Sequence, residues 1–325
     1  MLYGLCIRLR NLGYDFKLLR PRTVSVPVIS IGNITAGGTG KTPLVIWLCN
    51  YLQNRGIPCG ILTRGYKTGH GQITDEPALL ASACEGTCVV VNPDRAAGAK
   101  KAIYRHGAKL LVMDDGFQHR RLHRDMDIVV VDALCPFGYG RVLPSGLLRE
   151  PLTGLSRASA AVITRADQVE PSKLKQIETE IIRYAGEIPI ARTAHKFTGV
   201  VCDPKHKLAL EELKDKPVFA FCGIGNPDAF FDALRKCSMN LVGTEVFDDH
   251  YAYTAEDMEA IATQAASLGA EAILCTQKDW VKSALLLPRR DERPVFGYMA
   301  MELDFLDEPD TIKSLINALI ESRKN

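Results

Sequence analysis

Apolar residues along the chain fall into short continuous runs that alternate with segments of helical spacing. The runs are rich in β-branched residues, which predicts strands at residues 26–31, 59–62, 88–91, 110–113, 127–131 and 160–164. Between several of them, residues 43–55 and 96–106 carry apolar positions at three- and four-residue steps, which predicts helices. Continuous apolar strands that alternate with helices are typical of a parallel sheet covered on both faces.

A second set of such elements follows a polar stretch at residues 193–216. Strands are predicted at 218–222, 241–247 and 271–276, and helices at 228–236, 255–268 and 311–322. We therefore expect an α/β domain over residues 23–195 and a smaller α/β domain over residues 196–325. A length of 325 residues suits two domains.

The first 22 residues form a separate amphipathic unit that ends before the strand near Val26. Apolar positions recur on one helical face at Leu2, Leu5, Cys6, Leu9, Leu12, Phe16 and Leu19. Five basic residues accompany them, and Asp15 is the one acidic residue of the segment. Two interpretations stay open here: a basic helix that binds a membrane surface, or a helix packed on the core with solvated arginines.

Composition and charge exclude several classes of protein. The chain is 46% hydrophobic and 24% charged, with a net charge of +2, which does not favour nucleic acid as a partner. Its ten cysteines include no CxxC pair, which indicates reduced thiols in a cytosolic protein and not a disulfide framework or a zinc site. No apolar run reaches the ~18–20 residues of a membrane span, and the N-terminus lacks the pattern of a secretory signal.

A phosphate-binding loop is predicted directly after the first strand, where a helix begins. Its residues are Thr35, Ala36, Gly37, Gly38, Thr39, Gly40, Lys41 and Thr42, which match GxxxxGK[ST] except that Thr35 stands in place of glycine. Backbone N–H groups of such a loop surround phosphate oxygens, Lys41 reaches the β- and γ-phosphates of ATP, and the Thr42 hydroxyl is placed to ligate Mg²⁺. A glycine-rich turn without function is the alternative, and the strand before, the helix after and the GKT triplet together oppose it.

An acidic pair ends the strand at residues 110–113. In a parallel sheet with a phosphate loop, Asp114 and Asp115 would lie beside that loop and hold Mg²⁺ directly or through water. The alternative is a pair of acids that caps the next turn, because Gly116 follows.

Several segments together closely resemble the tetraacyldisaccharide 4'-kinase family of lipid A biosynthesis. They occur in one order, namely GNITAGGTGKTP (32–43), TRGYK (63–67), TDEPALLA (74–81), NPDR (92–95), DDGFQHRRL (114–122), LPSGLLREP (143–151), DDHYAYT (248–254) and TQKDWVK (276–282). The combination of GGTGKTP with DDGFQ is the specific part of this resemblance. It covers the chain from the N-terminal helix to about Lys282.

The resemblance implies an enzyme that transfers the γ-phosphoryl group of ATP to the 4'-hydroxyl of a tetraacylated glucosamine disaccharide 1-phosphate, with Mg²⁺. It implies a P-loop α/β domain with a smaller α/β domain across a cleft. It also implies a location at the cytoplasmic face of the bacterial inner membrane, where the N-terminal helix meets an anionic membrane surface. No obligate protein partner is evident.

The family's catalytic residues match two positions of this chain. An aspartate in the family's (G/T)DEP segment acts as the base beside a histidine of the second domain, which implies these roles for Asp75 and His250. Asp75 could instead cap the helix that follows it, and His250 could be an ordinary loop histidine. Arg95 and Arg149 are candidates to bind substrate phosphate, because arginine suits bidentate phosphate contacts.

Two other functions remain possible from the sequence. A nucleotide switch that controls a protein partner, such as a metallochaperone or a targeting GTPase, is favoured by TRAD (164–167), which echoes the TKxD base-binding motif of GTPases. A strand-end turn is the alternative for TRAD and for TQKD (276–279). A soluble sugar or nucleoside kinase would leave the basic amphipathic N-terminus unexplained.

Overall fold

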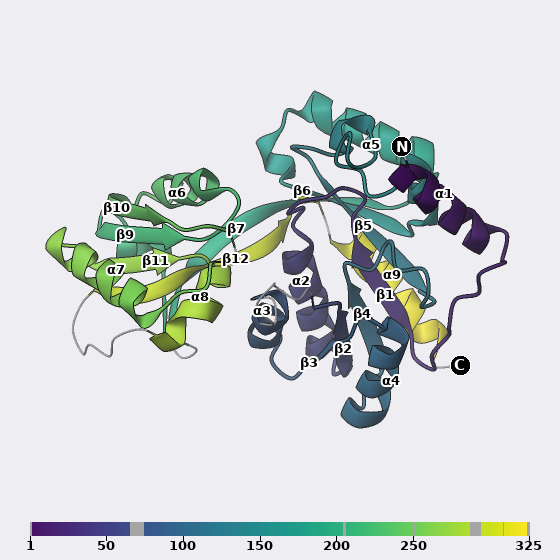
Figure 1. Ribbon diagram of the computed structural model, residues 1–325, viewed down its shortest axis with the longest axis horizontal. Coiled ribbons are helices and arrows are strands. Elements are labelled where there is room, and N and C mark those ends of the chain that lie inside the picture. Colours follow the sequence, from purple (N-terminus) through teal and green to yellow (C-terminus); the bar gives the residue numbers. More distant parts are fainter. Residues whose placement is uncertain are drawn as a thin grey trace. The chain divides into compact units, whose positions relative to one another are not determined.

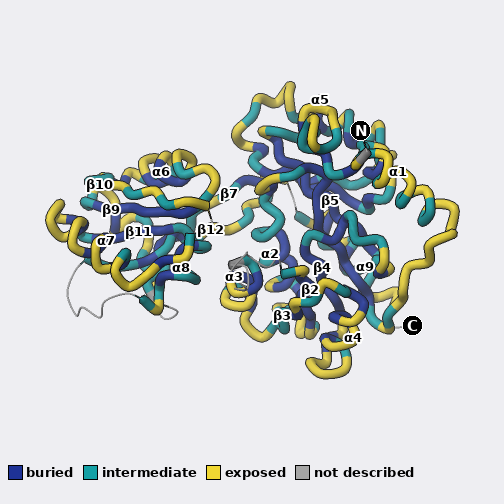
Figure 2. The backbone as a smooth tube through the Cα atoms, in the orientation of Figure 1, coloured by how far each residue is buried: buried dark blue, intermediate teal, exposed yellow. Residues whose placement is uncertain are grey.

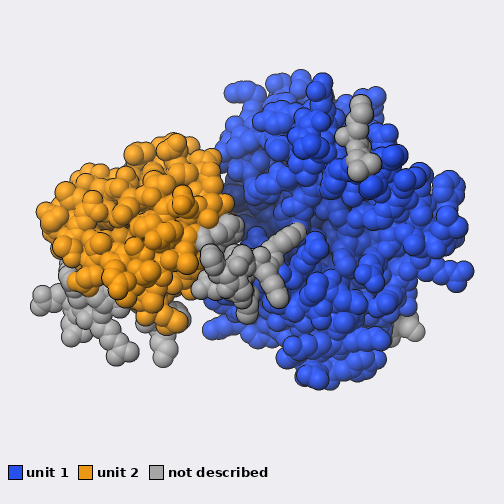
Figure 3. Space-filling view, viewed as in Figure 1, with its two compact units in different colours: residues 1–195, 303–325 blue, residues 196–302 orange. Residues whose placement is uncertain are grey.

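The computed structural model describes residues 2–65, 75–203, 206–249, 251–286, 294–307 and 309–323. The chain divides into two compact units, coloured separately in Figure 3. Unit 1 contains Met1–His195 and Leu303–Asn325, and unit 2 contains Lys196–Glu302. Each unit is an α/β structure with its own helices, strands and buried apolar clusters.

Unit 1 is built on a parallel sheet with the strand order β6-β5-β1-β4-β2-β3 (Figure 1). The strands are β1 (Val28–Gly32), β2 (Cys59–Thr63), β3 (Cys88–Val91), β4 (Leu110–Asp114), β5 (Met126–Asp132) and β6 (Ala160–Thr164). The first residues of β7 (Ile190–Asp203) add to β6 in parallel. Strand β1 therefore has β4 on one side and β5 on the other, which brings the ends of these three strands together.

Helices cover both faces of this sheet, as the continuous apolar strands predict. Strand side chains alternate between the faces: Ile29 and Ile31 of β1 pack in one cluster and Val28 in another. Helices α2 (Lys41–Asn54), α3 (Asp75–Ala83) and α9 (Asp310–Ser322) pack on the first face, and α4 (Arg95–His106) and α5 (Pro171–Ala185) on the second. Strands β1, β2, β4, β5 and β6 are buried along their whole length between these layers, whereas the edge strand β3 is partly exposed (Figure 2).

The local sequence sets where α4 begins and ends. The Asp94 carboxylate accepts hydrogen bonds from the backbone N–H groups of Ala96 at 3.0 Å and Ala97 at 3.3 Å, as expected of an N-cap. The helix stops at Gly107, whose φ of 70° is the left-handed conformation that glycine adopts readily.

The N-terminal helix α1 spans Leu2–Asp15, which is shorter than the segment to Pro21 that the apolar spacing indicates. Its end is fixed by backbone hydrogen bonds from Phe16 to Leu12 and from Leu19 to Gly13, with Lys17 at a φ of 59°. In the described part of the chain, none of the helices has the length and apolarity needed to span a membrane.

Unit 2 has a smaller sheet with the order β10-β9-β11-β12. Its elements are β8 (His206–Leu208), β9 (Pro217–Cys222), α6 (Pro227–Lys236), β10 (Asn240–Val246), α7 (Ala255–Ser267), β11 (Ala272–Cys275), α8 (Gln277–Ser283) and β12 (Val295–Phe305). Alternate residues of β9 pack with α6 on one face and with α7 on the other. The β9, β10, β11 and β12 pairings are parallel, and β8 pairs antiparallel with the later part of β7.

The compact units divide the chain differently from the three segments expected from the sequence. The chain breaks after His195, but residues 1–22 lie within unit 1, and Leu303–Asn325 also belongs to unit 1. The reason is packing: Ile312, Ile316 and Ile320 of α9 are buried in the same cluster as β1. Strands β7 and β12 both cross the boundary between the units.

Candidate active site

The predicted phosphate loop lies between the end of β1 and the first residue of α2 (Figure 1). Gly37 and Gly40 have φ values of 113° and 81°, which are left-handed conformations that favour glycine. A Cβ atom on Gly37 or Gly38 would meet no atom within 4 Å, so this part of the loop borders open space. A Cβ on Gly40 would lie only 3.1 Å from Thr164 Cγ2, so the loop is packed tightly just before Lys41.

Thr35, the position that departs from the loop pattern, needs no glycine in this structure. Its backbone forms an antiparallel bridge with Leu148, and it is absent from the described residues with positive φ. The N–H of Ala36 donates to Leu147 O at 2.7 Å, and the N–H of Arg149 donates to Ile34 O at 2.7 Å. The 147–149 segment therefore holds the start of the phosphate loop, which explains why threonine is tolerated there.

The loop contains a polar atom whose partner is missing. Thr39 is 3% exposed, and its Oγ1 is buried without a hydrogen bond. A buried hydroxyl without a partner is costly and uncommon. A phosphate oxygen or an ordered water would satisfy it, so the loop fits the anionic ligand that its sequence predicts.

Lys41 is held by groups that a phosphate would compete with. Its Nζ lies 3.2 Å from Asn33 Oδ1 and 3.4 Å from Asp115 Oδ1. Asp115 also accepts two hydrogen bonds from Arg149 Nη1, at 2.8 and 2.7 Å. Burial alone would raise the pKa of Asp115, but the Lys41 and Arg149 charges outweigh it and hold that pKa below its ordinary value. The carboxylate is therefore ionised and joins the phosphate-loop lysine to Arg149.

The backbone of Asp115 is strained, with a φ of 50° in the left-handed region. Such a conformation costs about 1–3 kcal/mol in a residue other than glycine and is concentrated at functional sites. This turn places the Asp115 carboxylate beside the Lys41 ammonium. Asp114, the last residue of β4, is instead buried, with only 4% of its surface exposed. The two acids predicted from the sequence therefore have different surroundings.

Asp114 is the less stable of the two as a carboxylate. Burial, followed by the nearby carboxylates of Glu76 and Asp115, raises the pKa of Asp114 to about 7. A buried carboxyl surrounded by other carboxylates is suited to a divalent cation, which would favour its ionised form. Thr42 lies in the first turn of α2, as the phosphate-loop pattern requires.

The donor set fits Mg²⁺ only together with a nucleotide. Among the residues that the structure describes, no group of three or more His, Cys, Asp and Glu side chains could hold a metal ion by itself. Mg²⁺ is commonly bound by one or two carboxylates together with substrate phosphates and waters. Thr42, Asp114 and Asp115 would supply such a partial set.

Arg95 and Arg149, the two candidates for phosphate binding, differ in their surroundings. Arg149 is half-buried and pairs with Asp115. Arg95 is 3% exposed and donates to the backbone carbonyls of Asn92 at 3.1 Å and Asp114 at 3.2 Å. Arg95 thus fixes the end of β4 that carries the acidic pair, and contact of either arginine with substrate stays a prediction.

A polar network around Glu150 was not predicted from the sequence, although Glu150, Gln118 and Asn33 lie inside the quoted motifs. Glu150 is fully buried and accepts hydrogen bonds from Arg157 at 2.8 and 2.9 Å, from Gln118 at 3.0 Å and from Asn11 at 3.0 Å. Gln118 also donates to the carbonyl of Asn33 at 2.7 Å. Through the contact of Gln118 with Glu150, the network joins the DDGFQ and LREP segments, and Gln118 links both to Asn33, a partner of Lys41.

Helix α1 takes part in this network from the protein surface. Asn11 reaches Glu150, and the Tyr3 hydroxyl donates to the backbone carbonyl of Arg149 at 3.1 Å. The other face of the segment is apolar and uncovered, with Leu5, Leu9, Phe16 and Leu18 between 54% and 80% exposed. The N-terminal segment therefore contacts the site region and presents an apolar surface to its surroundings.

Two predicted catalytic groups lie outside what the structure describes. Asp75 is the first residue of α3, but its side chain is not described, and His250 lies outside the described residues. The TQKD segment follows β11 directly: Thr276 is the N-cap of α8, and its Oγ1 accepts a hydrogen bond from the N–H of Asp279 at 3.2 Å.

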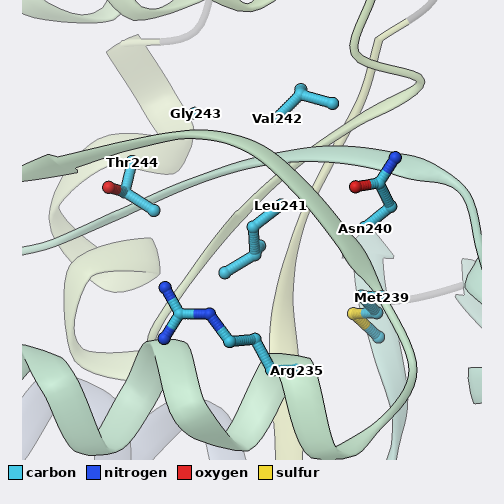
Figure 4. Close-up of a pocket in the computed structure, with 7 residues that line it drawn as sticks. All are labelled: Arg235, Met239, Asn240, Leu241, Val242, Gly243 and Thr244. Carbon is cyan, nitrogen blue, oxygen red and sulfur yellow. The ribbon is translucent and has the colours of Figure 1, made fainter.

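Unit 2 contains an open cavity of about 390 Å³ below β10 (Figure 4). Its lining residues are Arg235, Met239, Asn240, Leu241, Val242, Gly243 and Thr244. The guanidinium of Arg235 pairs with Asp232 at 2.8 Å. None of the predicted site residues with described side chains lines this cavity.

Comparison with known proteins identifies the family. The model of the tetraacyldisaccharide-1-P 4'-kinase family matches residues 1–321. The chain belongs to this family. Its relatives include the tetraacyldisaccharide 4'-kinases of Geobacter metallireducens, 37% identical over 305 residues (88% of this chain, 87% of the relative), and of Halothermothrix orenii, 36% identical over 311 residues (86% and 80%).

A solved structure of the same family has the same fold. The crystal structure of LpxK from Aquifex aeolicus in complex with ATP is 29% identical, with a TM-score of 0.78, and covers 98% of this chain and 96% of that one. The predicted parallel α/β architecture is confirmed by this likeness and by the sheet order of unit 1. The predicted resemblance to the tetraacyldisaccharide 4'-kinase family is confirmed by the match of the family model.

Proposed function

We propose that this protein is an ATP-dependent kinase that transfers the γ-phosphoryl group to the 4'-hydroxyl of a tetraacylated glucosamine disaccharide 1-phosphate in lipid A biosynthesis. The observation that carries the proposal is the placement of Lys41 beside Asp115 in a phosphate loop, in a chain matched along residues 1–321 by the family model. The orphaned Thr39 hydroxyl supports an anionic ligand at the same loop.

Lys41 and the loop would position and neutralise the triphosphate. When ATP arrives, its phosphate oxygens compete with Asn33 and Asp115 for the Lys41 ammonium, because all three are acceptors within its reach. Asp115 remains paired with Arg149, so its charge stays compensated after Lys41 turns to phosphate. Lys41 can therefore exchange the Asp115 carboxylate for a phosphate oxygen, and the Asp115 charge is still paired with Arg149.

Mg²⁺ would be held by Thr42, Asp114 and Asp115, and it supplies charge neutralisation of the transferring phosphoryl group when bound. The raised pKa of Asp114, about 7, means that a large fraction of this carboxyl is protonated near neutral pH before the cation is present. Ionisation of Asp114 is then coupled to cation binding.

Asp75 would accept the proton of the 4'-hydroxyl, with His250 as its partner. The support is the match of TDEP and DDHYAYT to the family segments that carry these roles. Asp75 opens α3, and the next residue, Glu76, has its carboxylate near Asp114, which sets the start of this helix beside the acidic pair.

The acyl chains of such a substrate require access from a membrane. The exposed apolar residues of the N-terminal segment, with Arg8 and Lys17 also exposed, support peripheral binding to an anionic membrane surface. Through Tyr3 and Asn11 the same segment contacts Arg149 and Glu150. We propose the cytoplasmic face of the bacterial inner membrane as the location of the enzyme, as the family resemblance implies.

Acceptor dependence of ATP turnover tests the proposal. The protein is incubated with ATP and Mg²⁺ in mixed micelles, with and without the tetraacyldisaccharide 1-phosphate, and ADP release is followed; Lys41→Ala is the control. We expect turnover that requires the acceptor. Slow hydrolysis that ignores the lipid and rises with a protein partner would instead support a nucleotide switch.

A further inference from the structure

The turn after β6 contacts the phosphate loop through two side chains. Thr164 is fully buried, and its Oγ1 donates a hydrogen bond to the carbonyl of Thr39 at 2.8 Å. The next residue, Arg165, donates from Nη2 to the carbonyl of Gly38 at 2.8 Å. Two successive carbonyls of the phosphate loop are thus bound by the last residue of β6 and the residue that follows it.

Asp132, the last residue of β5, holds the Arg165 guanidinium in place. Arg165 Nε donates to Asp132 Oδ1 at 2.9 Å, and Nη2 contacts the second carboxylate oxygen. Asp132 is 8% exposed and also accepts the N–H of Leu134 at 3.1 Å. A bidentate, partly buried pair of this kind fixes both position and orientation of the guanidinium.

The contacts of Arg165 with the loop and with Asp132 are kept although the backbone of Arg165 is in an unfavourable conformation. Arg165 has a φ of 54°, a left-handed conformation that costs about 1 kcal/mol or more in a residue other than glycine. The loop is also confined sterically, because a Cβ on Gly40 would lie 3.1 Å from Thr164 Cγ2 and 3.2 Å from His195 Nε2. A side chain longer than hydrogen at Gly40 would push the loop away from β6.

These contacts matter because a phosphate loop binds anions with its N–H groups. Each peptide unit carries its carbonyl opposite its N–H, so a carbonyl that turns inward withdraws a donor and faces the phosphate with a negative dipole. Engagement of the Gly38 and Thr39 carbonyls by β6 keeps these peptide planes in one orientation. Preorganised donors bind charge better than donors that must first reorient.

We propose that Thr164, Arg165 and Asp132 form a brace that positions the phosphate loop for the triphosphate of ATP. Arg165 does not touch ATP itself; it positions the loop that binds ATP, and Asp132 neutralises its charge. The proposal assigns a task to the first two residues of TRAD, which the kinase chemistry does not otherwise use. It rests on the proposed function insofar as the loop binds ATP.

The test compares Arg165→Ala, Arg165→Lys and Asp132→Asn with a control, Arg183→Ala, which removes an exposed arginine of α5 paired with Glu180 in the same unit. The full-length protein is titrated with ATP in the presence of EDTA and with Mg²⁺, by calorimetry. The KM for ATP and the KM for the lipid acceptor are measured separately, and circular dichroism and melting temperature report folding.

For Arg165→Ala we expect the Kd for ATP to rise about 10–100-fold, from the loss of a charge-assisted hydrogen bond. The KM for the lipid should stay within about twofold, since the brace contacts only the loop, and the same holds for both substrates in Arg183→Ala. The Kd of Arg165→Lys for ATP should lie between those of the wild type and Arg165→Ala, because one ammonium cannot pair bidentately with Asp132 and also reach the Gly38 carbonyl. Asp132→Asn should weaken ATP binding in the same direction, and it serves as the test if Arg165→Ala fails to fold.

Unchanged ATP affinity in folded Arg165→Ala or Asp132→Asn would overturn the brace, and so would an equal loss for ATP and lipid. Failure of the proposed function would give a different result. Arg165→Ala would still weaken ATP binding relative to the wild type, but the wild type would transfer no phosphate to the disaccharide.

Discussion

Replacement of Asp114 by asparagine should stabilise the protein and impair its activity at the same time. Asp114 is 4% exposed, and burial together with the carboxylates of Glu76 and Asp115 raises its pKa to about 7. In the unfolded chain the same carboxyl titrates near its ordinary value of 3.8. The folded protein therefore keeps a proton on Asp114 over a pH range in which the unfolded chain has already lost it.

The sign and size of the effect follow from proton linkage. Well below the unfolded-state pKa of 3.8 both states hold the proton, and Asp114 adds no pH dependence to the stability. Between pH 3.8 and pH 7 the folded protein retains the Asp114 proton, whereas the unfolded chain has lost it. The free energy of unfolding therefore falls as pH rises, by at most about 1.4 kcal/mol per pH unit. Above about pH 7 both states have lost the proton, and this dependence levels off. The Asp114→Asn variant has no proton to lose at this position, so the gap between variant and wild type should widen by about 2–3 kcal/mol from pH 5 to pH 8.

Urea denaturation at pH 5, 6.5 and 8, with EDTA and without nucleotide, measures this gap, and Asp167→Asn is the control because Asp167 is exposed. With saturating ATP and Mg²⁺ the order should reverse, because the ligands stabilise the wild type more than a variant that lacks a cation ligand. The kcat should fall in the variant. Parallel stability curves for wild type and Asp114→Asn across this pH range would refute the assignment of a buried carboxyl with a raised pKa at the end of β4.

Three further predictions concern other parts of the site. Lys41→Ala should lower kcat by ~10²–10³-fold or more in a folded protein, because it removes a preorganised charge; near-normal kcat would disprove the phosphate-loop assignment. Leu9→Ser with Phe16→Ser should reduce sedimentation with anionic vesicles while ATP affinity is kept, because these side chains are 60% and 72% exposed; full sedimentation would disprove the membrane-binding surface. Asp75→Ala should lower kcat by ~10²–10⁴-fold and His250→Ala by less; if they act as a pair, the double variant is little worse than Asp75→Ala, whereas simple multiplication of the two effects means independent roles.

Periodicity in the sequence was sufficient for the sheet of unit 1 but not for the strands that join the units. The runs at 110–113 and 127–131 are apolar on both faces because helices cover both, and they appear in β4 and β5. Strand β7 was missed because polar residues interrupt it: Thr193 is buried and donates to the carbonyl of Ile163 at 3.1 Å, a tertiary contact that the local pattern does not reveal. The placement of α9 with β1 likewise depends on contacts between residues nearly 300 positions apart, as Ile29 and Ile316 show.

The site shows the same division. The loop pattern identifies Lys41 because its chemistry depends on neighbours in sequence. The pairing of Asp115 with Arg149 and the burial of Glu150 depend on the fold, which joins two motifs separated by some thirty residues. TRAD echoes a base-binding motif, and only the structure shows its Thr164 and Arg165 bound to the phosphate loop.

The most direct test of the central claim is the fate of labelled γ-phosphate. The protein is incubated with γ-labelled ATP, Mg²⁺ and purified tetraacyldisaccharide 1-phosphate in mixed micelles, and the lipid product is isolated and its phosphate positions are determined by NMR and mass spectrometry. The account predicts one added phosphate, carrying the label, on the 4'-oxygen, and almost none with Lys41→Ala. Label found only as inorganic phosphate, or on another oxygen of the lipid, would contradict it.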